Sequence, residues 1–301
     1  MRTPTALCQR DAVTTPDHSR GGDRTSSSPC PRAAGDPVVI RLWPRTASDP
    51  PVVSTCLMCS AMHHADQAIP PEVAHFYDVL KRRRDVRAEF TGEPVDPSTV
   101  VRLLSAAHAA PSVGLSQPWD FIVVTSDRAR REFAQHVQRE RDVFAATLGD
   151  DEARRFETIK IDGVLEASLS IVVTYDADRG APHVLGRHAI ADTGLYSTCL
   201  AIENLWLACT LEGWGLGWVS FYRESFLRDL LAIPSSVRPV AWLCVGPVTY
   251  LQSVPDLERH GWRRRRELTE SLHVDQWLGT GSDALLVPDG PKFGGSVAPA
   301  G

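Results

Sequence analysis

The sequence predicts an α+β domain over residues 71–277, flanked by two segments of different composition. Within this stretch, helical and strand-like hydrophobic periods alternate, which is typical of helices layered on a sheet. Residues 1–70 are rich in Pro, Ser, Thr, Gly and Arg, and residues 278–301 in Gly, Ser, Ala and Pro, without a sustained period. We therefore expect both segments to be disordered and the folded part to have the size of one domain.

The first half of the domain predicts two amphipathic helices, a strand and a charged helix. Val73, Phe76, Val79 and Leu80 share one face of the first helix, and Pro97 opens the second, whose apolar face includes Val101, Leu104 and Ala107. The strand is a run of aromatic and β-branched residues, and the charged helix follows it. We expect these elements over residues 72–84, 97–110, 119–125 and 127–148.

The second half predicts three strands and two helices around one long apolar stripe. Leu195, Cys199, Ile202, Trp206 and Cys209 recur at steps of four and three, which places them on one face of a helix that ends near residue 213. Such a stripe is typical of a core or a subunit interface. We expect the strands over residues 169–175, 217–220 and 239–245, and the shorter helix over 224–231.

Charge and cysteine content exclude several classes of protein. The formal net charge is −5, whereas a general nucleic-acid-binding domain is normally basic. The 7 cysteines form no compact framework, which favours a reducing compartment. The chain has no apolar run long enough to cross a bilayer, and residues 1–30 lack the apolar stretch of a signal peptide. We therefore expect a cytoplasmic protein that binds neither nucleic acid nor membranes.

One acid, Asp85, lies within a dense basic run that spans residues 81–87. Guanidinium groups match phosphate oxygens and stay charged at every accessible pH, so Arg83, Arg84 and Arg87 are candidate phosphate ligands. The carboxylate has two open interpretations. It forms local ion pairs at a solvated helix end, or it accepts a proton from the phosphorylated molecule that the arginines bind.

Three further segments contain candidate ligand contacts. A loop between the second helix and the first strand offers backbone N–H groups and short polar side chains to a flat ligand. The glycine-rich strand that ends at Ser220 allows close approach of a ring, although a tightly packed strand explains its glycines equally well. A second basic cluster over residues 261–266 suits phosphate or solvent. The candidates in these segments are Ser112, Gly114, Gln117, Gly217, Trp218, Ser220 and Arg265.

Taken in order, four motifs resemble the FMN-binding nitroreductase superfamily. They are Arg-Arg-Asp-Val-Arg at 83–87, Ala-Pro-Ser-Val-Gly-x-x-Gln-Pro-Trp at 110–119, Gly-Trp-Val-Ser at 217–220 and Gly-Trp-Arg-x-Arg at 261–265. The stretches 182–188 and 195–208 are similar to one branch of it, the oxygen-dependent, flavin-fragmenting dimethylbenzimidazole synthases. The resemblance covers about residues 75–277.

This resemblance implies a nitroreductase-like fold, with a central, mostly antiparallel sheet flanked by helices, in an intertwined homodimer that holds FMN at the subunit interface. It implies that the phosphate and ribityl side of the flavin meets Arg83, Arg84, Arg87 and Arg265. The ring edge would lie along Gly217, Trp218 and Ser220. The loop would contribute Ser112, Gly114 and Gln117, from the same subunit or across the dimer.

The resemblance also implies a reaction. Members of the branch convert reduced FMN and molecular oxygen to 5,6-dimethylbenzimidazole, the lower ligand of vitamin B12, and erythrose 4-phosphate, so the flavin is consumed as substrate. No metal is needed, and a separate flavin reductase supplies the reduced FMN. Asp85 would assist proton removal at the first ribityl carbon while Ser220 orients the ring by hydrogen bonding. Ordinary nitroreductases usually carry a small polar residue at the position of Asp85.

Two alternative functions stay open. An NAD(P)H-dependent nitro- or quinone reductase would recycle FMN and need an open face above it, whereas fragmentation needs a closed pocket. The candidate lid is the segment 139–163, which includes Phe144, Phe156 and Lys160. The other alternative is a metal-binding or protein-interaction module in the N-terminal extension, where the donors suit zinc without a folded frame. These donors are Cys56, Cys59, His63 and His64.

Overall fold

A computed structural model describes residues 69–277 of the chain. The predicted disorder of residues 1–68 and 278–301 lies outside the described residues, as does the cysteine and histidine cluster of residues 56–64. None of the helices within the described range is long and apolar enough to cross a membrane.

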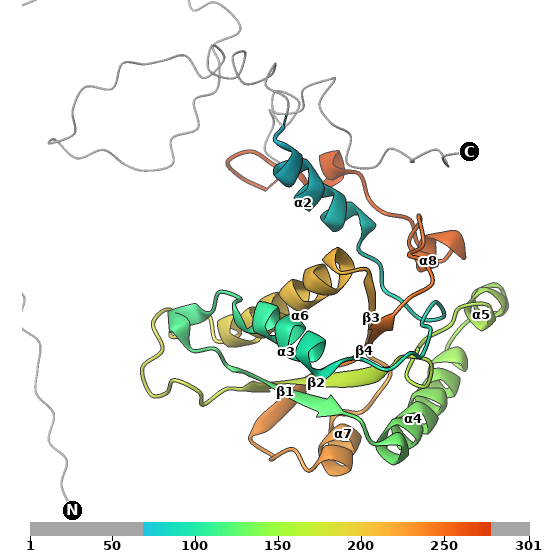
Figure 1. Cartoon of the computed structure of the whole chain (residues 1–301), viewed down its shortest axis with the longest axis horizontal. Coiled ribbons are helices and arrows are strands. Elements are labelled where there is room, and N and C mark those ends of the chain that lie inside the picture. The colour runs from blue at the N-terminus through green and yellow to red at the C-terminus, as the bar shows by residue number, and fades with distance from the viewer. Residues whose placement is uncertain (1–68, 278–301) are drawn as a thin grey trace, which may run out of the picture. The chain divides into compact units, whose positions relative to one another are not determined.

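Four antiparallel strands form one sheet in the order β1-β2-β4-β3 (Figure 1). Strand β2 pairs with β1 and β4, and β4 pairs with β3 at the edge of the sheet. The central antiparallel sheet is therefore confirmed. The strands are β1 (Trp119–Val124), β2 (Leu169–Asp176), β3 (Trp214–Val219) and β4 (Val237–Pro247).

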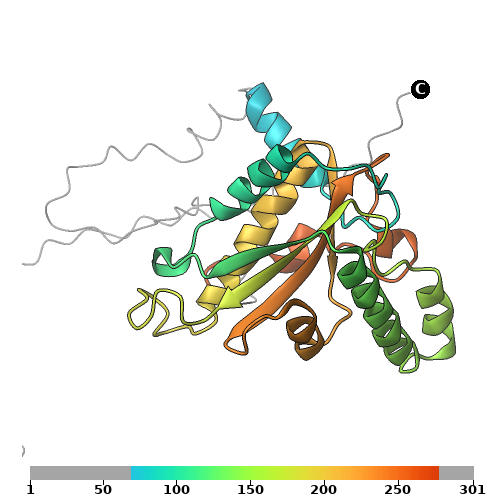
Figure 2. The ribbon, with the colours of Figure 1, turned by 60° about the horizontal axis from the view of Figure 1, so that its bottom comes forward.

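Helices cover both faces of the sheet because its strands alternate their side chains between two cores. On one face, Ile171 and Val173 of β2 pack with α3 (Pro97–His108) and α6 (Thr193–Leu211). On the other face, Val172 packs with α4 (Asp127–Ala145) and α7 (Glu224–Leu231). Figure 2 shows α3 and α6 on one side of the sheet and α4 and α7 on the other.

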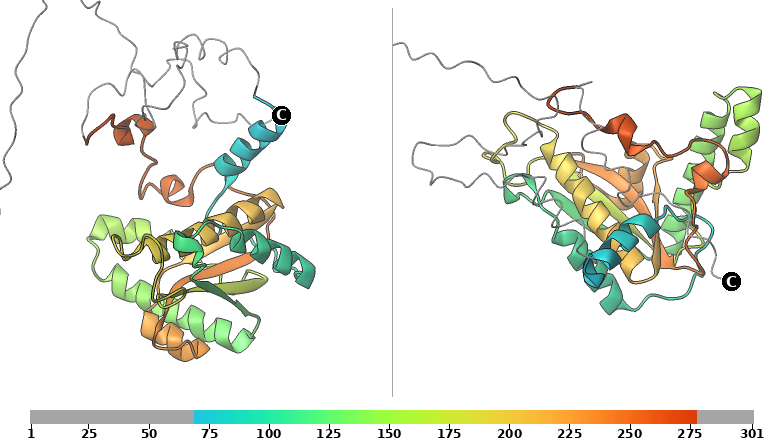
Figure 3. Two further views of the ribbon diagram at one scale, coloured as in Figure 1. Left: turned by 90° about the vertical axis from the view of Figure 1, so that its left-hand side faces the viewer. Right: turned by 90° about the horizontal axis from the view of Figure 1, so that it is seen from above.

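The remaining helices lie at the ends of the domain. Helix α2 lies against α6 (Figure 3), and α5 follows α4 within the candidate lid. These elements, with two short 3-10 helices, are α2 (Pro71–Arg82), α5 (Asp150–Glu157), α8 (Asp256–Arg259), η1 (Val113–Leu115) and η2 (Leu268–Ser271).

Two predicted helix faces agree with the observed ones only in part. In α3 the predicted Ala107 is buried together with Leu103, whereas Val101 is 64% exposed, because α6 covers the neighbouring side of the helix. In α2 the predicted Val79 is buried, but the same face leaves Phe76 54% exposed. Residues 69–277 therefore leave the apolar face of α2 incompletely covered.

Candidate functional site

The arginine-rich segment leaves α2 and runs beside the edge strand β3. The amide of Val86 donates to the carbonyl of Leu216 (3.0 Å), and Asp85 pairs with Leu216 as an isolated parallel bridge. This approach requires glycine in β3, because a Cβ added at Gly217 would lie 2.1 Å from the carbonyl oxygen of Val86. Gly217 thus permits close packing of two chain segments, which is the structural alternative that the sequence left open.

Asp85 and Arg87 form a bidentate ion pair at the end of β3. Both carboxylate oxygens accept hydrogen bonds from the Arg87 guanidinium, and Asp85 Oδ1 also accepts one from the Trp218 amide (2.9 Å). Arg87 Nη2 donates to the carbonyl of Trp218 (3.1 Å) as well. Burial opposes the charge on Arg87, but its interactions with Asp85 outweigh that cost, so the pKa of Arg87 lies above its ordinary value.

The ion pair that the first interpretation expects is present, and the second interpretation, proton transfer to Asp85, stays a prediction. The acid does form an ion pair, but not at a solvated helix end, because only 16% of the Arg87 side chain is exposed. The carboxylate itself is 43% exposed and lines a cavity. A fixed orientation together with access from a cavity suits a group that contacts a bound molecule.

Arg84 lies in an excess of positive charge. Burial, followed by the neighbouring charges of Arg265 and Arg83, lowers the pKa of Arg84 from its ordinary value. Its Nε is buried and has no hydrogen-bond partner within residues 69–277. Arg83 lies over the Trp206 ring, 4.8 Å from its centroid, and is 3.6 Å from Glu203. The structure thus brings Arg84 and Arg265 together with part of their charge unbalanced, which favours an anion such as phosphate.

A cavity of about 220 Å³ opens beside Asp85. Lys160 of the candidate lid lines it and pairs with Glu166 (2.5 Å). Four further lining residues could not be predicted from the sequence, because no motif marks them and they follow β4 in the chain; they are Gln252, Asp256, Arg259 and His260. The lining residues are Arg84, Asp85, Arg87, Ala88, Glu89, Thr158, Lys160, Gln252, Asp256, Arg259 and His260.

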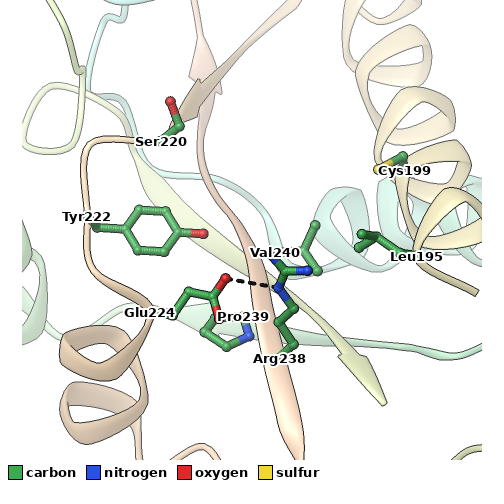
Figure 4. Close-up of a pocket in the computed structure, with 8 residues that line it drawn as sticks. All are labelled: Leu195, Cys199, Ser220, Tyr222, Glu224, Arg238, Pro239 and Val240. Atoms are coloured by element: carbon green, nitrogen blue, oxygen red, sulfur yellow. Dashed lines mark hydrogen bonds and ion pairs between the residues drawn. The ribbon is translucent and has the colours of Figure 1, made fainter. Parts of the chain in front are cut away.

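Ser220 lines a different cavity, of about 280 Å³. It follows the last residue of β3, and Figure 4 shows it together with Tyr222 across the cavity from Leu195 and Cys199 of α6. Asp85 and Ser220 therefore open into separate cavities along the same edge of the sheet, linked through Trp218, which hydrogen-bonds Asp85. The remaining lining residues are Glu224, Arg238, Pro239 and Val240.

The loop of Ser112, Gly114 and Gln117 lies at the start of α6. Ser112 Oγ accepts from the Gln117 amide (3.0 Å), and the Val113 amide donates to Ser197 Oγ (3.1 Å). Gly114 has φ +56°, and a Cβ there would lie 2.9 Å from the backbone nitrogen of Leu185. The loop is therefore shaped by contacts with α6 and with residues 184–185.

Helix α6 separates this loop from the arginine segment. Ser197 contacts the loop, whereas Trp206 Nε1 donates to the carbonyl of Arg84 (2.9 Å). Nine residues separate the two positions, and at 3.6 residues per turn they lie about 180° apart around the helix axis. Within one chain, the two predicted groups of flavin ligands consequently lie on opposite sides of α6.

An aromatic cluster holds the candidate lid against the end of β3. The ring centroids of Phe144 and Phe156 lie 5.1 Å apart, and Phe221, which follows Ser220, lies 5.7 Å from Phe144 and 6.2 Å from Phe156. Trp262, next to the second basic cluster, lies 6.1 Å from Phe156. The lid segment is thus packed against both regions that the sequence singled out.

Residues 80–247 match a family model described as "Nitroreductase family". The chain belongs to the nitroreductase family. It is 37% identical over 184 residues to a 5,6-dimethylbenzimidazole synthase of Rhodospirillum rubrum, an alignment that covers 61% of this chain and 87% of that protein. A protein of the same description from Rhodobacter capsulatus is 36% identical over 186 residues, an alignment that covers 62% of this chain and 89% of that protein.

Two solved structures share the fold of this chain. An iodotyrosine deiodinase bound to FMN and 3-iodo-L-tyrosine superposes with a TM-score of 0.51 at 20% identity, covering 68% of this chain and all of that one. An NADPH:FMN oxidoreductase from Vibrio harveyi in complex with NAD⁺ superposes with a TM-score of 0.50 at 18% identity, covering 70% of this chain and 81% of that one. The predicted nitroreductase-like α+β fold is confirmed.

Proposed function

We propose that this nitroreductase-family chain converts reduced FMN and molecular oxygen to 5,6-dimethylbenzimidazole and erythrose 4-phosphate. The observation that carries the proposal is the oriented, cavity-facing carboxylate of Asp85 inside the arginine segment. Its support is the identity of 36–37% to two proteins described as 5,6-dimethylbenzimidazole synthases, over 87–89% of their length. In this reaction FMN is a substrate, and a separate flavin reductase supplies its reduced form.

The residues at the sheet edge suit a flavin phosphate and ring. Arg84 has a buried guanidinium nitrogen without a partner in the described range, and Arg265 adds positive charge beside it. Arg83 and Arg87 extend this basic surface toward the ribityl chain. From there, Gly217, Trp218 and Ser220 lead along β3 to the second cavity, where the ring would lie. Reduced flavin supplies the electrons that oxygen accepts.

Two protein groups would act on the bound substrate. Asp85 would accept the proton removed from the first ribityl carbon, because its carboxylate faces the cavity and the Trp218 amide fixes its orientation. Ser220 would hold the ring edge by hydrogen bonding from the adjacent cavity. The bound flavin and the packed lid together would keep water from both groups.

A complete site needs a second copy of the chain. Since α6 separates Ser112, Gly114 and Gln117 from Arg84, a flavin that contacts both groups lies between two subunits. Exposed apolar side chains on α2 and α6 provide the surface for this homodimer. They are Val73, Phe76, Leu80, Tyr196, Leu200 and Leu211. We place the catalytic unit at residues 71–277, in the cytoplasm.

Chemically reduced FMN mixed with the protein in air tests the proposal, with the products analysed by mass. We expect 5,6-dimethylbenzimidazole from the wild type, a loss of about 10²- to 10⁴-fold in Asp85→Asn, and no loss in a variant of the exposed Asp229 on α7, Asp229→Asn. If all three proteins return only intact FMN, the proposal fails. NAD(P)H-dependent reduction of a nitro compound or quinone would then support the reductase alternative.

A further inference from the structure

A hydrogen bond joins the candidate lid to the segment that follows β4, at the wall of the cavity beside Asp85. Helices α5 and α8 lie at the same end of the domain (Figure 1), and Thr158 Oγ1 lies 3.0 Å from His260 Nδ1. Thr158 follows the last residue of α5, and His260 follows the last residue of α8. Both residues line the cavity that Asp85 faces, so their contact closes part of its wall.

The direction of this hydrogen bond is fixed by its neighbours. The Thr158 hydroxyl donates its proton to the carbonyl of Arg155 (2.8 Å), so its oxygen accepts from the Nδ1–H group of His260. The other nitrogen of the neutral ring, Nε2, is then an acceptor, and Arg259 Nη2 lies 3.4 Å from it. Arg259 also donates to Asp256 Oδ1. Helix α8 therefore orients the imidazole that binds the lid.

Helix α5 is held to α4, so a contact at the end of α5 restrains the rest of the lid. Arg141 of α4 donates to the carbonyls of Phe156 (3.2 Å) and Ile159 (3.0 Å), and its guanidinium lies 5.0 Å from the centroid of the Phe156 ring. Trp262, two residues after His260, packs on the same ring. The segment 256–262 thus contacts the lid through a hydrogen bond and an aromatic pair.

We propose that His260 is a positioning residue that keeps the lid closed while reduced FMN reacts with oxygen. The inference rests on the proposed function. In an open site, reduced FMN gives two electrons and two protons to molecular oxygen and leaves as intact FMN with hydrogen peroxide. Fragmentation requires that flavin and oxygen stay together in a closed cavity. The bond between His260 and Thr158 would therefore decide how much flavin is fragmented and how much is only oxidised.

The test measures the ratio of hydrogen peroxide to 5,6-dimethylbenzimidazole in a single turnover. Protein in excess is loaded with reduced FMN without oxygen and then mixed with aerated buffer. Thr158→Val removes the acceptor and His260→Ala the donor. Thr147→Val is the matched control, because Thr147 is also exposed in the lid and donates to the carbonyl three residues earlier, that of Phe144 (2.7 Å). Among the described residues, the Thr147 hydroxyl has no hydrogen-bond partner after β4.

We expect the ratio to rise about fivefold in Thr158→Val and in His260→Ala, which is the equilibrium factor of one neutral hydrogen bond, and to stay unchanged in Thr147→Val. The double variant should show no larger ratio than either single variant, because both remove the same bond. His260→Asn, whose amide nitrogen can donate from the place of Nδ1, should recover most of the wild-type ratio.

The outcomes separate the inference from the proposed function. If the wild type forms product and both single variants keep its ratio, the inference is overturned and the proposed function stands. Slower product formation at an unchanged ratio shows a structural role only and also overturns the inference, as does an equal rise in Thr147→Val. If the wild type returns only FMN and hydrogen peroxide, the proposed function fails and the inference fails with it.

Discussion

Replacing Gly217 by alanine tests whether packing of the arginine segment on β3 builds the site. The added Cβ would lie 2.1 Å from the carbonyl oxygen of Val86 and 2.9 Å from Arg87 Nη1, so the two backbone segments must separate. Separation breaks the hydrogen bond from the Val86 amide to Leu216 and the one from Trp218 to the Asp85 carboxylate. A neutral bond contributes about 1 kcal/mol and a charged one about 2 kcal/mol, so we expect the free energy of unfolding to fall by about 3 kcal/mol.

Urea denaturation of Gly217→Ala measures this loss, and Gly149→Ala is the matched control. A Cβ at Gly149 meets nothing within 4 Å, so its substitution should cost about 0.5 kcal/mol, which reflects its place at the start of α5. We also expect Gly217→Ala to bind FMN more weakly, because Asp85 and Arg87 lose their support on β3. If Gly217→Ala costs no more than Gly149→Ala, the arginine segment does not depend on this contact.

Three further predictions address pH, phosphate and the second copy. Burial lowers the pKa of His136, whose Nε2 accepts a hydrogen bond from the Arg223 amide (3.0 Å). As the pH falls, the imidazole is therefore protonated at a higher pH in the unfolded chain than in the folded one. The free energy of unfolding should fall between about pH 7 and 5, by at most about 1.4 kcal/mol per pH unit, and urea denaturation should show a flatter profile for His136→Gln. Arg265→Ala should weaken FMN binding about 5- to 30-fold, but riboflavin binding not at all, in fluorescence titrations. Coexpressed Asp85→Asn and Gln117→Ala chains should restore intact sites to about a quarter of the wild-type number, whereas sites within single chains would give none.

The order and type of the main elements could be predicted because each has a clear hydrophobic period. The long helix was expected to end near residue 213 and ends at Leu211. All four strands overlap their predicted ranges, but β3 begins at Trp214 and ends at Val219, whereas the sequence predicted residues 217–220. The side of α3 that is buried could not be predicted, because the helix has apolar residues on more than one side and α6 decides which are covered. Val101 is exposed for that reason.

The environment of the arginine segment could not be predicted from the sequence for a different reason. A run of seven residues with five cationic side chains is typical of a solvated surface, and Arg82 is indeed exposed. Arg87 is largely buried because Gly217, 130 positions later in the same chain, lets the arginine segment pack closely on β3. Only the tertiary structure shows that these two segments are neighbours. The same holds for Gln252 and His260, which belong to no recognisable motif and line the cavity beside the arginine segment because of the path of the chain after β4.

The pattern of α6 contains one more signal about the assembly. Its Ala201 and Leu205 face the sheet, Ser197 faces the loop, and Trp206 faces the arginine segment. A helix that is apolar on every side is normally buried on every side. The fourth side nevertheless exposes 55% of Tyr196, and Leu200, Leu207 and Leu211 lie on it as well. Residues 69–277 cover three sides of α6 and leave this apolar one open, so we propose that a second copy covers it and brings Ser112 and Gln117 to the flavin.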